Sequence, residues 1–215
     1  DMPADEDEDG ICDSAPYLTP PIITGATPSS PSADSNPTLS VYYGMSGGSA
    51  SIFDNPDCAG NPIASAGPGD IGGSSYTVAV SVALNTSTTL YAQVVAEGIT
   101  SPCSVGFPYT HDDIAPSTPI IDLNGITTAI INCGTANILI SGNAEEESIV
   151  ALYESSSCDD ISATPVAIAT TDATGFWSIN ATIENLTGPI SLKAKSEDSA
   201  GNLSPCSVII TPELE

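Results

Sequence analysis

Six cysteines carry the clearest chemistry in this sequence, and their spacing favours disulfides. No two of them form a Cys-x-x-Cys pair, which argues against a zinc site. The single histidine, His111, has no second imidazole with which to share a metal ion. Disulfides form and persist in oxidising compartments, so we expect an exported protein that works outside the cell or on its surface.

The first 13 residues carry a second chemical pattern, a run of acids with the spacing of a calcium loop. The ligands of a Ca²⁺ ion would be four carboxylates and one backbone carbonyl, from Asp5, Asp7, Asp9, Ile11 and Asp13. Gly10 would allow the sharp turn, but Pro16 stands where an EF-hand has its bidentate acid. Over about nine residues the stretch is similar to the calcium loops of thrombospondin type 3 repeats. The alternative is a disordered acidic tail.

The residues needed for catalysis are sparse. His111 lies between two similar halves of the chain, and a Ser-His-Asp arrangement would have to be built around this residue, which we expect to be exposed. There is no G-x-S-x-G motif and no phosphate-binding loop. Two carboxylates alone could serve a glycosidase, but nothing in the sequence marks a cleft. We therefore expect a protein that is not an enzyme.

The net charge of the chain limits the classes of partner that it can bind. The chain has 27 acids against two bases, Lys193 and Lys195, for a net charge of −25. Such a chain repels phosphate backbones and anionic lipids, so we expect no nucleic acid partner. No apolar run approaches the roughly 20 residues of a membrane helix, so we expect no membrane insertion. Asp1 opens no secretory leader, which suggests a mature or excised product. Many of the acids could simply form a soluble surface.

Composition and periodicity predict an all-β protein. Aromatic residues make up 5% and hydrophobic residues 40% of the chain, with 18 glycines and 18 prolines. This profile suits many short strands joined by turns. In one predicted strand Leu90, Ala92 and Val94 face one way, and the residues between them face the other.

The chain repeats itself. The string SPCSV occurs at 101–105 and again at 204–208, and the strand patterns upstream of each copy also correspond. Two copies of a unit of roughly 100 residues, each with about seven strands, predict two tandem immunoglobulin-like β-sandwiches in a linear array. We expect an acidic segment over 1–13, domain 1 over 14–112 and domain 2 over 113–215. A stiff linker with three prolines is predicted over 111–122.

The second copy resembles the bacterial immunoglobulin-like repeats of large surface adhesins and extracellular fibre proteins. The resemblance covers residues 14–215, and its motif residues are Leu152, Tyr153, Cys158, Gly175, Trp177, Asp198, Ala200, Gly201, Asn202 and Cys206. The first copy departs from it, because it reads VAEGITSPC where the second reads SEDSAGNLSPC. We expect Trp177 to lie in the core.

The repeat and the resemblance together suggest how four cysteines pair. Bonds Cys58–Cys103 and Cys158–Cys206 use one connectivity twice and match the disulfide of the family, although six free thiols are the alternative. Each bond would stabilise its domain by about 4 kcal/mol in the chain-entropy model. Cys12 and Cys133 remain, at opposite ends of the predicted array. We hypothesise that they form an intermolecular disulfide between copies stacked head to tail; a free thiol or a bond to an upstream segment would also fit.

A second cation site is predicted where the domains join. The last loop of domain 2 would return Asp198 and Asn202 to the end at which Asp112 and Asp113 arrive. Carboxylates that converge without basic partners favour a bound cation such as Ca²⁺, although the loop residues could instead satisfy turn backbone. Four N-x-S/T sequons are candidate glycosylation sites, at Asn85, Asn180, Asn185 and Asn202.

These patterns favour a non-catalytic structural protein. The leading hypothesis is a pair of modules in an adhesin stalk or in a head-to-tail, self-assembling extracellular fibre, with other copies of itself or flanking immunoglobulin-like domains as partners. A module that binds a carbohydrate or a host protein, or accessory domains of a secreted enzyme, would be the alternative. The surface that such a protein touches is not specified by the sequence.

Overall fold

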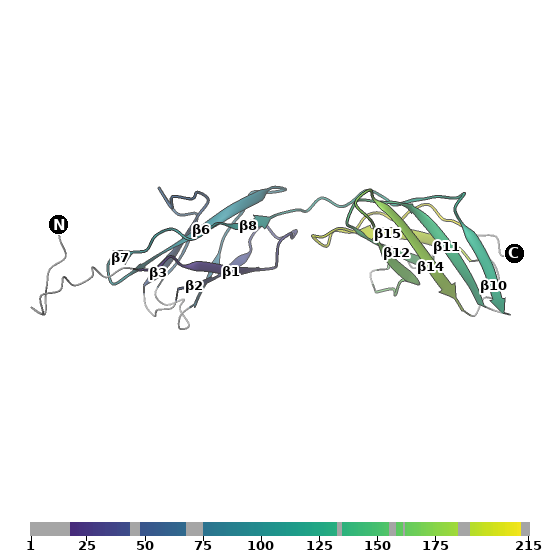
Figure 1. Cartoon of the computed structure of the whole chain (residues 1–215), viewed down its shortest axis with the longest axis horizontal. Coiled ribbons are helices and arrows are strands. Elements are labelled where there is room, and N and C mark those ends of the chain that lie inside the picture. Colours follow the sequence, from purple (N-terminus) through teal and green to yellow (C-terminus); the bar gives the residue numbers. More distant parts are fainter. Residues whose placement is uncertain are drawn as a thin grey trace, which may run out of the picture. The chain divides into compact units, whose positions relative to one another are not determined.

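The computed structural model describes residues 18–43, 48–67, 75–132, 135–154, 158–160, 162–184 and 190–211. The chain divides into two compact units, Asp1–Asp112 (unit 1) and Asp113–Glu215 (unit 2), and both are built from β-strands (Figure 1). In the part that the structure describes, no helix is long and apolar enough to cross a membrane.

Unit 1 consists of two antiparallel sheets. Its strands are β1 (Ile22–Thr27), β2 (Thr38–Tyr42), β3 (Ser49–Phe53), β4 (Ala64–Ala66), β5 (Ser75–Ala79), β6 (Ser87–Ala96), β7 (Ile99–Thr100) and β8 (Phe107–Thr110). One sheet has the order β1-β2-β5, and the other has the order β4-β3-β6-β7 with β8 also paired to β6.

Unit 2 repeats this arrangement. Its strands are β9 (Ile120–Ile121), β10 (Thr127–Asn132), β11 (Thr135–Asn143), β12 (Ile149–Glu154), β13 (Ala167–Thr170), β14 (Phe176–Ile183) and β15 (Leu192–Glu197). One sheet has the order β10-β11-β14, with β9 paired to the far end of β11. The other has the order β13-β12-β15.

The cores lie between the paired sheets because alternate residues of each strand point inward. On β6 the side chains of Leu90, Ala92 and Val94 are fully buried, as the sequence predicted. On β14 every second residue is buried, beginning with Trp177, which is 1% exposed. The prediction that Trp177 belongs to the core is confirmed. Each unit has its own apolar cluster.

The strand order confirms the predicted fold class. When the short strand β9 is left out of the numbering, the first, second and fifth strands of each unit form one sheet, whereas the third, fourth and sixth form the other. Two antiparallel sheets connected in this way make an immunoglobulin-like β-sandwich.

The prediction for the linker was wrong at both ends. At its start, His111 forms a parallel bridge with Ser32 and therefore belongs to unit 1. At its end, Ile120 and Ile121 already pair with β11. His111 is only 2% exposed, so the expectation of an exposed histidine was also wrong. Strand pairing continues past β8, and this pairing draws the imidazole into unit 1.

Candidate functional site

Both predicted disulfides are present. Cys58 is bonded to Cys103 in unit 1, and Cys158 is bonded to Cys206 in unit 2, with Cα–Cα distances of 5.7 and 6.3 Å. Cys58 follows β3 and Cys158 follows β12, whereas their partners lie in the segments that run beside β6 and β15. Each disulfide therefore ties the end of the unit to the middle of the same sheet.

The serines of the SPCSV string hold that last segment of unit 1 against β6. The amide of Ser101 donates to the carbonyl of Val94 (2.8 Å), and the amide of Val94 donates back to the Ser101 hydroxyl oxygen (3.0 Å). Ser104 and Ala92 exchange the same two hydrogen bonds, both at 2.8 Å. In each pair a serine hydroxyl accepts the bond that a strand carbonyl would normally accept.

Unit 2 has the same arrangement at the equivalent positions. The amide of Ser204 donates to the Ser196 carbonyl and the Ser196 amide donates to the Ser204 hydroxyl oxygen, both at 2.9 Å. Ser207 and Ala194 exchange a further pair at 2.8 Å. All four SPCSV serines are buried, at 6% exposed or less. We call the two serines of each unit, with their bonds to β6 or β15, the serine clamp.

The serine clamp explains the repeated string. Its serines are three residues apart, yet their partners on β6 or β15 are only two apart, so one extra residue is accommodated as in a β-bulge. The bulge contains the Pro-Cys pair, whose cysteine forms the disulfide. Sequence reasoning recognised the repeat and the cysteines but missed the serines. Their signal was present: an identical Ser on each side of Pro-Cys in both copies.

Unit 1 joins its beginning to its end by parallel strand pairing. The amide of Ser32 donates to the Thr110 carbonyl (3.1 Å), and the amide of Asp112 donates to the Ser32 carbonyl (2.9 Å). The amide of Thr110 donates to the hydroxyl oxygen of Ser30 (2.8 Å). These three bonds, which we call the terminal clamp, join residues 30–32 to residues 110–112. In the described part of unit 2, no parallel bridge of this kind occurs.

Two side chains next to the terminal clamp fix the same end of unit 1. Nδ1 of His111 accepts the amide of Asn85 (2.9 Å), while the amide of His111 donates to the Thr86 carbonyl (3.0 Å). The hydroxyl of Tyr109 donates to the carbonyl of Asp34 (3.0 Å). His111 thus has a structural role in closing the sandwich.

The predicted joint residues are found in two different settings. In unit 2, Oδ1 of Asp198 accepts the amides of Ala200 (2.9 Å) and Asn202 (2.8 Å), and the Asn202 side chain donates to Oδ2 (2.9 Å). Asp198 and Asn202 therefore satisfy turn backbone, the alternative raised by the sequence. Asp112 takes part in the terminal clamp of unit 1, whereas Asp113 opens unit 2. Among the described residues, no three His, Cys, Asp or Glu side chains are grouped to hold a metal ion. Calcium at the joint stays a prediction.

Other predicted sites fall partly outside the described residues. These are the ligands Asp5, Asp7, Asp9, Ile11 and Asp13, the cysteines Cys12 and Cys133, and the sequon residue Asn185. Of the remaining sequon residues, Asn180 is exposed on β14 and Asn85 is exposed in a turn with φ of 52°. Asn202 uses its amide nitrogen in the bond to Asp198.

The comparisons with known proteins add little to this geometry. No protein-family model and no curated protein matches the sequence. Among solved structures, the chain is similar to the FN1-FN3 domains of chicken CNTN1, at 14% identity and a TM-score of 0.41. The match covers 94% of this chain and 68% of that one. At this level of similarity, the fold assignment rests on the strand pairing.

Proposed function

We infer that this chain is a non-catalytic structural module that bears tension outside the cell, as part of an adhesin stalk or an extracellular fibre. The observation that carries this inference is the terminal clamp of unit 1. Residues 30–32 and 110–112 run parallel, and they lie near the beginning and the end of the same sandwich.

Parallel pairing of this kind resists pulling because of its direction. Tension on the chain draws the first segment toward its N-terminus and the second toward its C-terminus, so the two segments slide past one another in opposite directions. The three hydrogen bonds lie across the direction of sliding and are loaded together. Bonds that open one after another would fail at a lower force, since forced unfolding follows the rate at which the barrier is crossed.

The two disulfides support the same role. When a unit does unfold, the Cys58–Cys103 and Cys158–Cys206 bonds keep 45- and 48-residue stretches of chain from extending. Disulfides are also typical of exported domains, and they agree with an extracellular setting.

Force spectroscopy on single molecules of the full chain tests the proposal. We expect two unfolding events, with unit 1 resisting a higher force than unit 2. Reduction of the disulfides should lengthen the chain released by about 150 Å for the 45-residue stretch and about 165 Å for the 48-residue stretch, at about 3.4 Å per residue. The two increments assign each event to its unit.

The matched variant is Ser30→Ala, which removes one acceptor of the terminal clamp. It should lower the unfolding force of unit 1 and leave that of unit 2, the internal control, unchanged. If unit 1 yields at no higher force than unit 2, and if Ser30→Ala changes neither, the chain is not built to bear tension and the proposal fails.

A further inference from the structure

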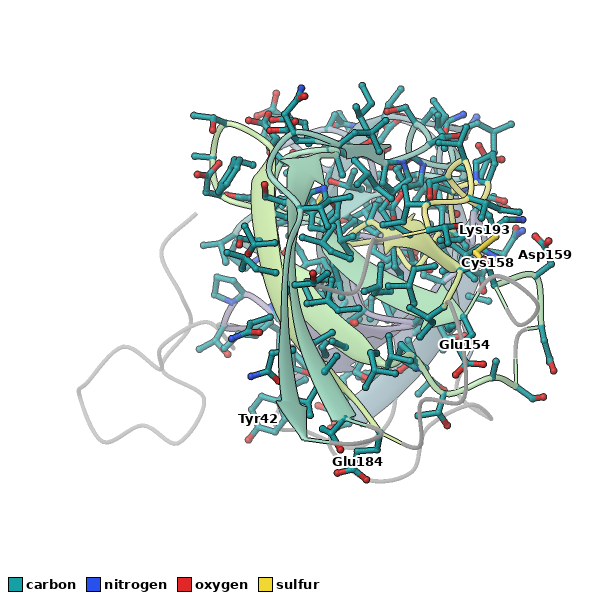
Figure 2. The ribbon with its side chains drawn as sticks, turned by 90° about the vertical axis from the view of Figure 1, so that its right-hand side faces the viewer. Tyr42, Glu154, Cys158, Asp159, Glu184 and Lys193 are labelled. Carbon is teal, nitrogen blue, oxygen red and sulfur yellow. A yellow bond between two sulfur atoms is a disulfide. The ribbon has the colours of Figure 1, made fainter. Side chains whose placement is uncertain are left out.

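The only two basic residues of the chain stand together on one sheet face of unit 2. On β15 the side chains of Leu192, Ala194 and Ser196 are buried, so Lys193 and Lys195 between them point outward and are partly exposed. In Figure 2, Lys193 lies on the same side of the unit as Glu154, Cys158 and Asp159.

Neighbouring strands complete this face. In register, Lys193 lies opposite Tyr153 and Lys195 lies opposite Ala151 on β12, and Ala151 lies opposite Ile168 on β13. Ile168 is 63% exposed. We call these five residues, Ala151, Tyr153, Ile168, Lys193 and Lys195, the lysine face. It joins two cationic heads to an aromatic ring and an exposed aliphatic side chain, a mixture typical of interaction surfaces.

The lysines are a departure from the repeat. The serine clamps align Ala92 with Ala194 and Val94 with Ser196, because the two residues of each pair exchange the same two hydrogen bonds with the equivalent SPCSV serine of their unit. The position of Lys195 therefore corresponds to Gln93 in unit 1, and that of Lys193 corresponds to Tyr91. Unit 1 builds the same sandwich without a charge at either position, so the fold does not require the lysines.

We propose that the lysine face binds the acidic N-terminal segment of a second copy of this chain, through residues 5–9. That segment, DEDED, is the longest run of acids in the sequence. In a protein with 27 acids and two bases, only a contact that uses the lysine face can place unlike charges between two copies.

The range of electrostatic forces favours this segment over the acidic turn at 145–147. Charges are screened over about 8 Å at physiological ionic strength. Five consecutive acids at 5–9 can place more carboxylates within that distance of the two lysines than the three acids at 145–147 can.

The test measures self-association of the full chain by sedimentation velocity, in a chelator and at low salt. Lys193→Gln with Lys195→Gln should weaken association about fivefold to tenfold, the effect of losing two exposed ion pairs. The matched control, Thr77→Glu with Thr89→Glu, changes exposed positions of unit 1 and makes the net charge of −25 more negative by the same two charges. It should leave association nearly unchanged.

A charge swap tests whether residues 5–9 are the segment that binds the lysine face. Lys193→Glu with Lys195→Glu should abolish association, and replacing all five acids of residues 5–9 with lysine in the same chain should restore it. Restoration supports the proposal. No association of the native chain at low salt, an equal loss in the Thr77 and Thr89 control, or a swap that restores nothing would each overturn it; the last outcome would assign the face to another acidic surface. The tension-bearing function is tested by unfolding forces on single chains. A negative result in the self-association experiment would therefore contradict the lysine-face proposal and not the tension-bearing function.

Discussion

Two carboxylates of unit 2, those of Asp172 and Asp160, hold turns through hydrogen bonds that also lower their pKa values. Oδ1 of Asp172 accepts the hydroxyl (2.7 Å) and amide (2.8 Å) of Thr174 and the amide of Phe176 (3.0 Å). The Thr174 hydroxyl, followed by the two backbone amides, lowers the pKa of Asp172 below its usual 3.8. Asp160 is lowered in the same way by the hydroxyl and amide of Ser162. Acids of this type hold loops in shape.

The pKa of Asp172 predicts how unit 2 responds to acid. Because the folded-state pKa lies below the unfolded value, the carboxylate stabilises unit 2 above about pH 4, and this contribution is lost as the pH falls through the folded pKa. Asp172→Ala should therefore destabilise unit 2 at pH 6 but have a smaller effect near pH 2. Urea denaturation followed by Trp177, the one tryptophan, measures this. An equal loss at both pH values would contradict it.

At the scale of strands, the serine clamp replaces regular pairing along the last segment of each unit. The hydroxyl of Ser207 accepts the amide of Ala194 and also donates to the Val208 carbonyl (3.0 Å), so one side chain satisfies two backbone groups. Both serine and partner are buried, which makes the loss of the hydroxyl costly.

Ser207→Ala should destabilise unit 2 by about 1–3 kcal/mol, since the Ala194 amide would be buried without an acceptor. The free energy of unfolding follows from urea denaturation with Trp177 as reporter. Ser178→Ala, an exposed serine on β14, is the control and should change it by no more than about 0.5 kcal/mol. Similar losses for the two variants would show that the clamp adds no stability.

The sequence was informative about elements and less so about their ends. Alternation predicted the buried face of β6, and the cysteine spacing together with the repeat and the resemblance gave both disulfides. The burial of His111 could not be predicted, because its pairing with Ser32 joins residues almost 80 positions apart and leaves no local pattern. The serine clamp was missed for a related reason: a serine that accepts a strand amide has the same composition as any serine in a turn.

At the scale of the whole chain, the two units have separate cores and separate cross-links. The two units differ in the turn that follows β6 in unit 1 and β15 in unit 2. Unit 1 turns from β6 to β7 through Glu97 and Gly98, which both have positive φ, as two-residue hairpin turns require. Unit 2 uses the longer loop anchored by Asp198. The departure from the family pattern noted in the first copy is therefore a change of turn within a retained sandwich.

Because each unit has its own disulfide, removing one disulfide should lower the unfolding free energy of that unit alone. Cys58→Ser with Cys103→Ser should destabilise unit 1 by about 4 kcal/mol, because its unfolded chain regains the freedom of a closed 45-residue loop. Scanning calorimetry should show one transition move to lower temperature, while the urea midpoint reported by Trp177 in unit 2 stays the same. A matching shift at Trp177 would mean that the units unfold as one.

The proline inside each serine clamp has a consequence for crowded assemblies. Pro102 and Pro205 lie in the last segment, at the rim of their sheets, and neither can offer an amide to an incoming strand. A sheet edge that contains a β-bulge and lacks one backbone amide donor is a poor template for pairing with further strands. Many copies could therefore stand close together without their sheets merging at this rim into amyloid-like aggregates.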